Sequence, residues 1–298
     1  MVPGAASTAV GHGPPARTAA RRVVTVVLRV FGVLLRVAGV LMLVTSAVLG
    51  IQAWWSRFSV CLVRGEPPVP GLPEDGAGAC VALQDHLYDY SVPQAPWVPI
   101  ADAAQREGLS LIALGLGVAV VSLSLGGRWF VWPLSVAGGA GLAAMWAGMG
   151  EPVWRSGLAG EPVGFVDWRA ASALGMLTLL STPALALLTW FHGGRDGRLL
   201  AVFWAAMTAA QPLPELLFTL SVWGSHDTSP LRGFARCAIV AVAAVVIALT
   251  LIPVDRRDRL LPRPVRALGR AVRRALPTAA AKMRELDGRL SPSRPSRR

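Results

Sequence analysis

The sequence predicts an all-α protein, a polytopic bundle of six transmembrane helices with both termini in the cytoplasm. The 298-residue chain is 53% hydrophobic and only 15% charged, whereas about a quarter of the residues of a typical soluble protein are charged. Its apolar residues form runs close to the roughly 20 residues that a helix needs to cross a bilayer. Its basic residues are concentrated in the two ends and in short links between the runs. These observations favour a membrane protein.

The N-terminal segment combines a Gly-, Ala- and Pro-rich stretch with an apolar helix. Residues 1–20 have the composition of a disordered cytoplasmic terminus. A helix is expected to begin at Arg21, with its transmembrane span from about Val37 to Trp55. Its arginines recur every seven residues and so lie along one stripe: Arg22, Arg29 and Arg36. Such a stripe is typical of side chains that extend to lipid headgroups, and it is too sparse for a voltage sensor.

Residues 56–107 are expected to form a large loop on the outer side. Repeated prolines predict extended or turning backbone through much of this loop. The loop contains Cys61 and Cys80, and thiols on the outer side can oxidise. We therefore predict a Cys61–Cys80 disulfide, which would close a loop of about 20 residues. At the end of the loop, Asp102 and Gln105 have the spacing of a helix N-cap and its capping partner.

Five further spans are expected between the loop and the C-terminal tail. They lie at residues 108–125, 129–148, 170–191, 199–223 and 229–253. Tight Gly-Gly-Arg turns are expected at 126–128 and 193–195.

The link after the third span contains two copies of one short sequence. Gly-Glu-Pro-Val occurs at 150–153 and again at 160–163, and both copies are predicted to form turns. Within the third span itself, small residues recur at every fourth position: Ala140, Ala144 and Gly148. This spacing predicts that another helix approaches closely along that face.

Residues 255–298 form a basic tail with 14 basic and 4 acidic residues. An amphipathic helix within the tail gathers its arginines on one side: Arg263, Arg266, Arg270, Arg273 and Arg274. This pattern is typical of a helix that lies in a membrane interface, and its arginines are the predicted lipid-binding residues. Because the tail is attached to a bilayer, we expect anionic headgroups rather than nucleic acid as its partner.

The distribution of charge predicts the orientation. With six spans, 22 basic residues fall on the side of the termini and 7 on the opposite side, which also holds 11 carboxylates. Positive charge remains in the cytoplasm, so both termini are expected there. Every basic residue except Lys282 is an arginine, which indicates GC-rich coding. We expect the inner membrane of a bacterium as the location.

Glu215 is the only carboxylate expected well inside an apolar run. Pro212 and Pro214 remove backbone donors beside it and loosen the helix there. An ionisable group in hydrocarbon is costly and marks a functional candidate. The fifth and sixth helices are expected to run antiparallel side by side, so we predict that Glu215 pairs with Arg236, with Gln211 close by. In the alternative, Glu215 is protonated and bonded to backbone carbonyls that Pro214 leaves free.

No motif in the sequence indicates an enzyme, a metal site or a cofactor. Phosphate-binding loops, zinc-protease patterns, hydrolase elbows and dinucleotide fingerprints are all missing from the sequence. Asp85, His86 and Asp89 lie within five positions, but without a further His or Cys at suitable spacing they are interpreted as a solvated face.

Three classes of function are therefore weighed. The first is a non-enzymatic membrane protein, anchored by anionic lipid, that organises or assists an unidentified membrane protein partner in the envelope. The alternative is a small transporter or channel that uses Glu215 as a proton or cation site. A membrane enzyme comes third and would require Glu151, Glu161, Asp85 or His86 to converge. A packed bundle with Glu215 paired favours the first class, and a polar cavity beside Glu215 favours the second.

Overall fold

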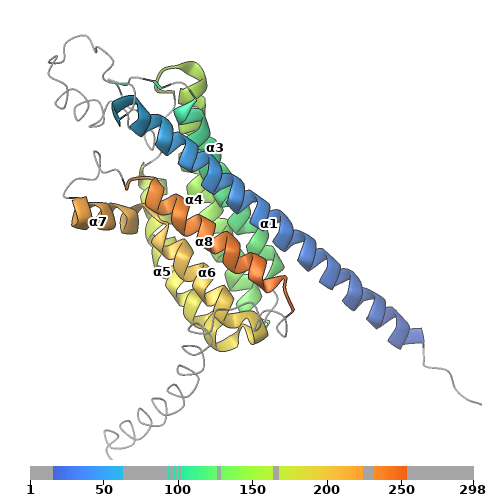
Figure 1. Cartoon of the computed structure of the whole chain (residues 1–298). Coiled ribbons are helices and arrows are strands. Elements are labelled where there is room, and N and C mark those ends of the chain that lie inside the picture. The colour runs from blue at the N-terminus through green and yellow to red at the C-terminus, as the bar shows by residue number, and fades with distance from the viewer. Residues whose placement is uncertain are drawn as a thin grey trace, which may run out of the picture. The chain divides into compact units, whose positions relative to one another are not determined.

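The computed structural model describes residues 16–62, 93, 95, 97, 99–100, 102–125, 129–163, 168–223 and 231–253. Within these residues the protein is entirely helical, with no strand, and the all-α prediction is confirmed (Figure 1). The helices are α1 (Ala16–Leu62), α3 (Ala103–Ser124), α4 (Val131–Ala159), α5 (Trp168–His192), the 3-10 turn η2 (Gly194–Asp196), α6 (Gly197–Ala209), α7 (Pro212–Trp223) and α8 (Phe234–Thr250). They belong to a compact unit that ends at Leu251, and a second unit begins at Ile252.

Three of these helices are long and apolar enough to cross a membrane. They comprise Arg22–Arg57 within α1, Ala103–Ser124, which is α3, and Ser172–His192 within α5. Helices α6, α7 and α8 are also apolar but shorter. The described part of the chain therefore has the helical character of a membrane protein.

Helix α1 is longer than the sequence analysis predicts. It runs unbroken for 47 residues, or about 70 Å at the usual helical rise. Residues 16–20, expected to be disordered, are helical, and so are residues 56–62, expected to begin the outer loop. Proline is missing throughout this range, so nothing in the backbone interrupts the helix.

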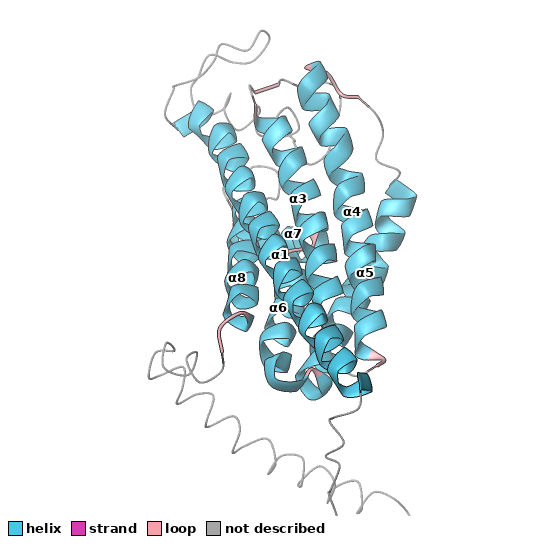
Figure 2. Ribbon diagram, turned by 90° about the vertical axis from the view of Figure 1, so that its right-hand side faces the viewer, coloured by secondary structure: helices cyan, strands magenta, loops and turns pink. Residues whose placement is uncertain are grey.

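Six of the helices close into a ring. Helix α3 packs between α1 and α4, α5 packs between α4 and α6, and α8 packs between α6 and α1. Figure 2 shows α1, α3 and α4 side by side, with α6 and α8 behind α1. The ring encloses a core of fully buried side chains that includes Leu43, Leu114, Leu142, Trp146, Phe203 and Trp204. Helix α7 is not a member of the ring.

Helices α3 and α4 touch through their backbones. A Cβ atom on Gly108 would lie 2.4 Å from the backbone nitrogen of Trp154, and one on Gly150 would lie 2.6 Å from the carbonyl oxygen of Gly108. Further along the same contact, a Cβ on Gly139 would lie 2.1 Å from Ser122 Oγ. Because these distances leave no space for a side chain, glycine at each position is what permits the approach.

The predicted close-packing stripe is on the wrong face. Ala140, Ala144 and Gly148 are all exposed, and a Cβ on Gly148 would meet nothing within 4 Å. Small residues also recur on the opposite side of α4, at Gly139 and Gly150, and that side faces α3. Spacing alone could not distinguish the two faces.

The first Gly-Glu-Pro-Val copy does not form a turn. Residues 150–153 are helical, α4 continues to Ala159, and Gly150 packs against α3. The helix ends at Gly160, whose φ of 74° is left-handed and whose N–H donates to Ser156 O at 2.9 Å. The turn therefore begins one repeat later than the sequence analysis places it.

The predicted capping box at the start of α3 is also wrong. Asp102 has a left-handed φ of 62° and makes no side-chain cap. Its carboxylate instead pairs with Arg106 at 3.3 Å. The Gln105 side chain reaches α4, where Nε2 donates to Gly157 O at 2.5 Å.

The Gly-Gly-Arg turn between α5 and α6 is confirmed, and it is tied to two other helices. Gly194 adopts a left-handed φ of 67° at the start of η2. Two residues further along, Asp196 lies 3.6 Å from Arg36 of α1, measured from Oδ2 to Nη1. The same Arg36 nitrogen donates to Thr250 Oγ1 at the end of α8, at 3.3 Å. Arg36 therefore connects α1 to the α5–α6 turn and to the end of α8 at this end of the ring.

The glycine contact between α3 and α4 can be tested by adding one methyl group. Gly150→Ala is expected to lower the free energy of unfolding by about 1–3 kcal/mol, because the methyl group would overlap Gly108 O. Gly148→Ala is the matched control two residues away and should leave stability unchanged or raise it by up to about 1 kcal/mol. Thermal unfolding of both variants in the same detergent measures the difference. Equal stability of the two variants would contradict the packing.

Candidate functional site

The expected fifth span is broken at the prolines, where the sequence predicts only a loosened helix, so it forms two helices. Helix α6 ends at Ala209, and α7 begins at Pro212 and turns away from the axis of α6 (Figure 1). Pro212 and Pro214 have no N–H to donate to the last turn of α6, and the loss of two donors in three residues favours a break there. Glu215 follows in the first turn of α7, where its N–H donates to Gln211 O at 3.1 Å.

A buried ion cluster forms around Arg236, in the first turn of α8. It consists of Arg236, Glu107 of α3 and Glu215 of α7. Arg236 Nη2 donates to Glu107 Oε1, and Nη1 lies 3.9 Å from Glu215 Oε2. The three residues are only 5%, 6% and 7% exposed. A charge this far from water is costly unless an opposite charge lies beside it, and each carboxylate of the cluster has Arg236 as that partner.

Glu215 also caps α8 from outside that helix. Its Oε1 accepts a hydrogen bond from the backbone N–H of Gly233 at 2.6 Å. Gly233 precedes the first residue of α8 and has a φ of 77°, a conformation that favours glycine. A helix N-terminus has unpaired N–H groups and a partial positive charge, so a carboxylate is favoured there. Glu215 therefore connects α7 to α8 through the backbone as well as through Arg236.

Aromatic side chains complete the surroundings of the cluster. The Arg236 guanidinium lies 5.9 Å from the ring centroid of Trp146 of α4, within the range of a cation–π contact. Trp54 of α1 and Phe234 of α8 pack with their ring centroids 5.0 Å apart. The start of α8 is thus in contact with α1, α3, α4 and α7.

Glu215 lies near Arg236, as expected from the sequence, but the helices that bring the two residues together are arranged differently. The expected side-by-side alignment of α7 with α8 is wrong, because α6 rather than α7 packs along α8. The closer partner of Arg236 is Glu107, which the sequence analysis assigns to the end of the outer loop. One signal could have identified it: Glu107 is the last charged residue before a run without charge that continues to Arg128.

Gln211 faces α5 rather than the ion cluster. Its Oε1 accepts a hydrogen bond from Thr178 Oγ1 at 3.1 Å, and its Nε2 donates to Thr182 Oγ1 at 3.1 Å. Thr208 of α6 donates to the same Thr182 hydroxyl at 2.8 Å. These contacts hold the break between α6 and α7 against α5, and they satisfy a side chain that is 1% exposed.

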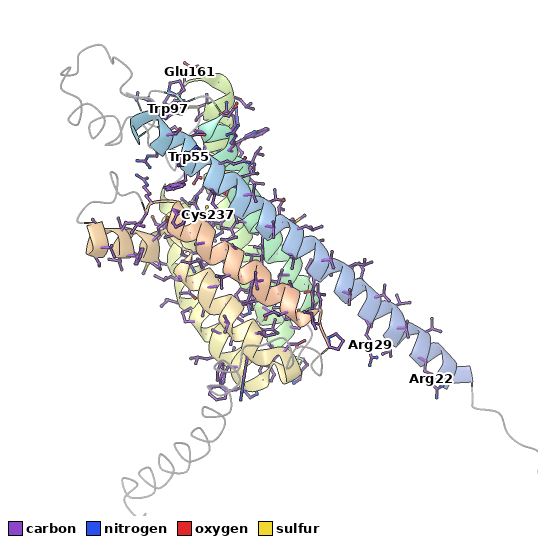
Figure 3. All side chains as sticks on the ribbon, viewed as in Figure 1. Arg22, Arg29, Trp55, Trp97, Glu161 and Cys237 are labelled. Atoms are coloured by element: carbon purple, nitrogen blue, oxygen red, sulfur yellow. The ribbon has the colours of Figure 1, made fainter. Side chains whose placement is uncertain are left out.

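Glu151 and Glu161 do not form part of this cluster. Glu151 is exposed and pairs with Arg155 one turn away in α4, at 3.0 Å. Glu161 is exposed beyond the end of α4 (Figure 3). Cys237 is a buried free thiol at the start of α8.

Several predicted sites fall on residues that the structure does not describe. The backbone of Cys61 belongs to the last turn of α1, but its side chain and Cys80 lie outside the described residues, so the disulfide remains a prediction. The same holds for the loop residues Asp85, His86 and Asp89 and for the tail arginines. Across the described ranges, no group of three or more His, Cys, Asp or Glu side chains could hold a metal ion.

Comparison of the chain with protein-family models, with curated proteins and with solved structures found no match.

The ion cluster makes a quantitative prediction for charge removal. Arg236→Gln leaves two carboxylates buried without their cation and is expected to cost about 3–5 kcal/mol of stability. Glu107→Gln should cost more than Glu215→Gln, because Glu107 is the closer partner. Combining Arg236→Gln with Glu107→Gln should cost less than the sum of the two single losses, since only Glu215 is then left without its cation.

Thermal unfolding in detergent measures this cycle. Glu151→Gln is the control, because it breaks a half-exposed pair of the same residue types. Exposed pairs contribute at most about 1 kcal/mol. Strict additivity of the Glu107 and Arg236 losses would show that the two side chains do not interact.

Proposed function

We propose that the chain is a non-enzymatic, multi-pass protein of the bacterial inner membrane that organises or assists a partner membrane protein. The observation that carries this proposal is that the Glu215 carboxylate is bound by other groups of the same chain. Its carboxylate contacts Gly233 N and Arg236, and the residue is 7% exposed. A packed bundle with Glu215 paired is the arrangement expected of an accessory protein. A transport site would instead require this carboxylate to face a polar cavity.

The proposed topology has six crossings with both termini cytoplasmic. An even number of crossings returns the chain to its starting side. In support, Arg36 of α1 contacts Thr250 at the end of α8, so the N-terminal part of α1 and the C-terminal end of α8 are close. The proposed topology puts three further arginines on the cytoplasmic side: Arg22, Arg29 and Arg198. This agrees with the rule that positive charge remains in the cytoplasm. The basic tail would then bind anionic lipid at the cytoplasmic surface.

One observation favours a second candidate, a small transporter or channel that uses Glu215 as a proton or cation site. Transporters commonly place their binding sites where a transmembrane helix is discontinuous. The break between α6 and α7 lies beside Glu215 and is rich in hydroxyl and amide groups. Those groups are hydrogen-bonded to one another, which favours a structural role for the break.

Ion flux distinguishes the two candidates. Proteoliposomes with an internal pH or sodium indicator and an imposed gradient should show no more flux than protein-free liposomes. Glu215→Gln should change the stability of the protein without changing flux, because the carboxylate is a structural partner. A flux that Glu215→Gln abolishes and Glu151→Gln retains, in folded protein, would contradict the accessory role and select the transporter.

A further inference from the structure

The N-terminal arm of α1, residues 22–35, is apolar, and the described part of the chain leaves most of its large side chains exposed. Nine of its large side chains are 49–64% exposed: Val23, Val24, Val26, Val27, Leu28, Val30, Phe31, Val33 and Leu34. Figure 3 shows Arg22 and Arg29 on the part of α1 that extends beyond the other helices. Exposed apolar surface of this extent on one element indicates an interaction surface.

The arm carries a narrow cationic stripe on this apolar surface. Arg22 and Arg29 are exposed and seven residues apart, so they differ by only about 20° around the helix. Thr25 and Gly32 lie within about 60° of the stripe, and Val27 and Phe31 lie about 160° from Arg29. Acidic residues are missing from the whole of α1. The arm therefore complements an anionic surface that has an apolar layer beneath it.

Arg36 fixes where the arm leaves the bundle. Its contacts to Asp196 and Thr250 lie at the end of the ring, at the α5–α6 turn and the end of α8. The apolar segment Arg22–Arg57 is 36 residues long, about 54 Å, whereas the hydrocarbon core is about 30 Å thick. If α1 stood upright in the bilayer, the arm would project its valines and leucines into water. A tilted α1 keeps them in lipid.

We propose that the arm lies obliquely in the leaflet at the Arg36 end of the bundle, where it binds anionic phospholipid. Its apolar sector enters the acyl chains, and Arg22 and Arg29 reach the phosphates. A second copy of the chain fits less well as the occupant. A two-helix contact covers only a narrow seam of each helix, whereas the arm is apolar around all but its arginine side. This lipid contact is independent of the tail and of Glu215, so it can fail without affecting the proposed function.

Depth measurement on the full-length protein tests the placement. Spin labels are introduced one at a time at Val27, Phe31 and Thr25 of a variant without native cysteines. The labelled protein is then reconstituted in phosphatidylcholine vesicles that contain phosphatidylglycerol. Labels at Val27 and Phe31 should contact oxygen and exclude a water-soluble nickel chelate, and the label at Thr25 should be shallower. A label at Leu180 of α5, which is 71% exposed, checks that the bundle is inserted.

Two outcomes would overturn the placement. High nickel accessibility at all three arm positions, with Leu180 protected, would place the arm in water. Spin–spin broadening that increases with the ratio of protein to lipid would identify a second copy as the occupant. Both outcomes are readable in the same samples.

The anionic part of the proposal needs its own variant. Arg22→Gln with Arg29→Gln should abolish the difference in label depth between vesicles with and without phosphatidylglycerol. Arg198→Gln is the control, because Arg198 is exposed on α6 and stacks on Trp190 at 5.4 Å. Equal depth of the unsubstituted arm in neutral and anionic vesicles would refute a specific anionic contact.

Discussion

Neutralising the buried charge of Arg236 is the constraint on which the arrangement of the helices depends. This arginine is in the first turn of α8, where the N-terminal dipole already disfavours a cation. Glu107 compensates from α3, and Glu215 compensates from α7 while also accepting the N–H of Gly233. The break after α6 follows from the same need, because it gives Glu215 its position in the first turn of α7.

Close backbone packing provides the framework that holds the cluster in place. Gly108, the residue after Glu107, lies against Gly150 and Trp154, so Glu107 is positioned where α3 and α4 touch. A similar contact lies beside Arg236: a Cβ on Gly50 of α1 would lie 2.4 Å from Cys237 Sγ. Gly108 is therefore the sequence neighbour of Glu107, and Gly50 contacts Cys237, the sequence neighbour of Arg236. Packing and charge compensation are consequently coupled, since moving either helix would separate the ions.

Much of the fold could be predicted from the sequence, because helical spans depend on local apolar composition. The helical class and the α5–α6 turn follow from such local signals, whereas the prolines beside Glu215 indicate a loosened helix and not the full break between α6 and α7. Glu107 as the main partner of Arg236 could not be found this way, because the two residues are 129 positions apart and meet only through the ring. The same limit applies to α4, where two faces carry small residues and tertiary packing selects Gly139 and Gly150. Residues 150–153 are likewise helical despite Pro152, and Gly150 among them packs against α3.

In the interior of the helical unit Arg236 contacts both carboxylates, with Glu107 as the nearer one. Dipolar recoupling in solid-state NMR between the guanidinium nitrogens of Arg236 and the carboxyl carbons of Glu107 and Glu215 measures this directly in lipid bilayers. The variants Glu107→Gln and Glu215→Gln assign each coupling to one of the two carboxyl carbons. The account predicts a strong coupling that disappears in Glu107→Gln and a weaker coupling that disappears in Glu215→Gln. Coupling to neither carboxyl carbon, in protein whose helices are intact, would contradict it.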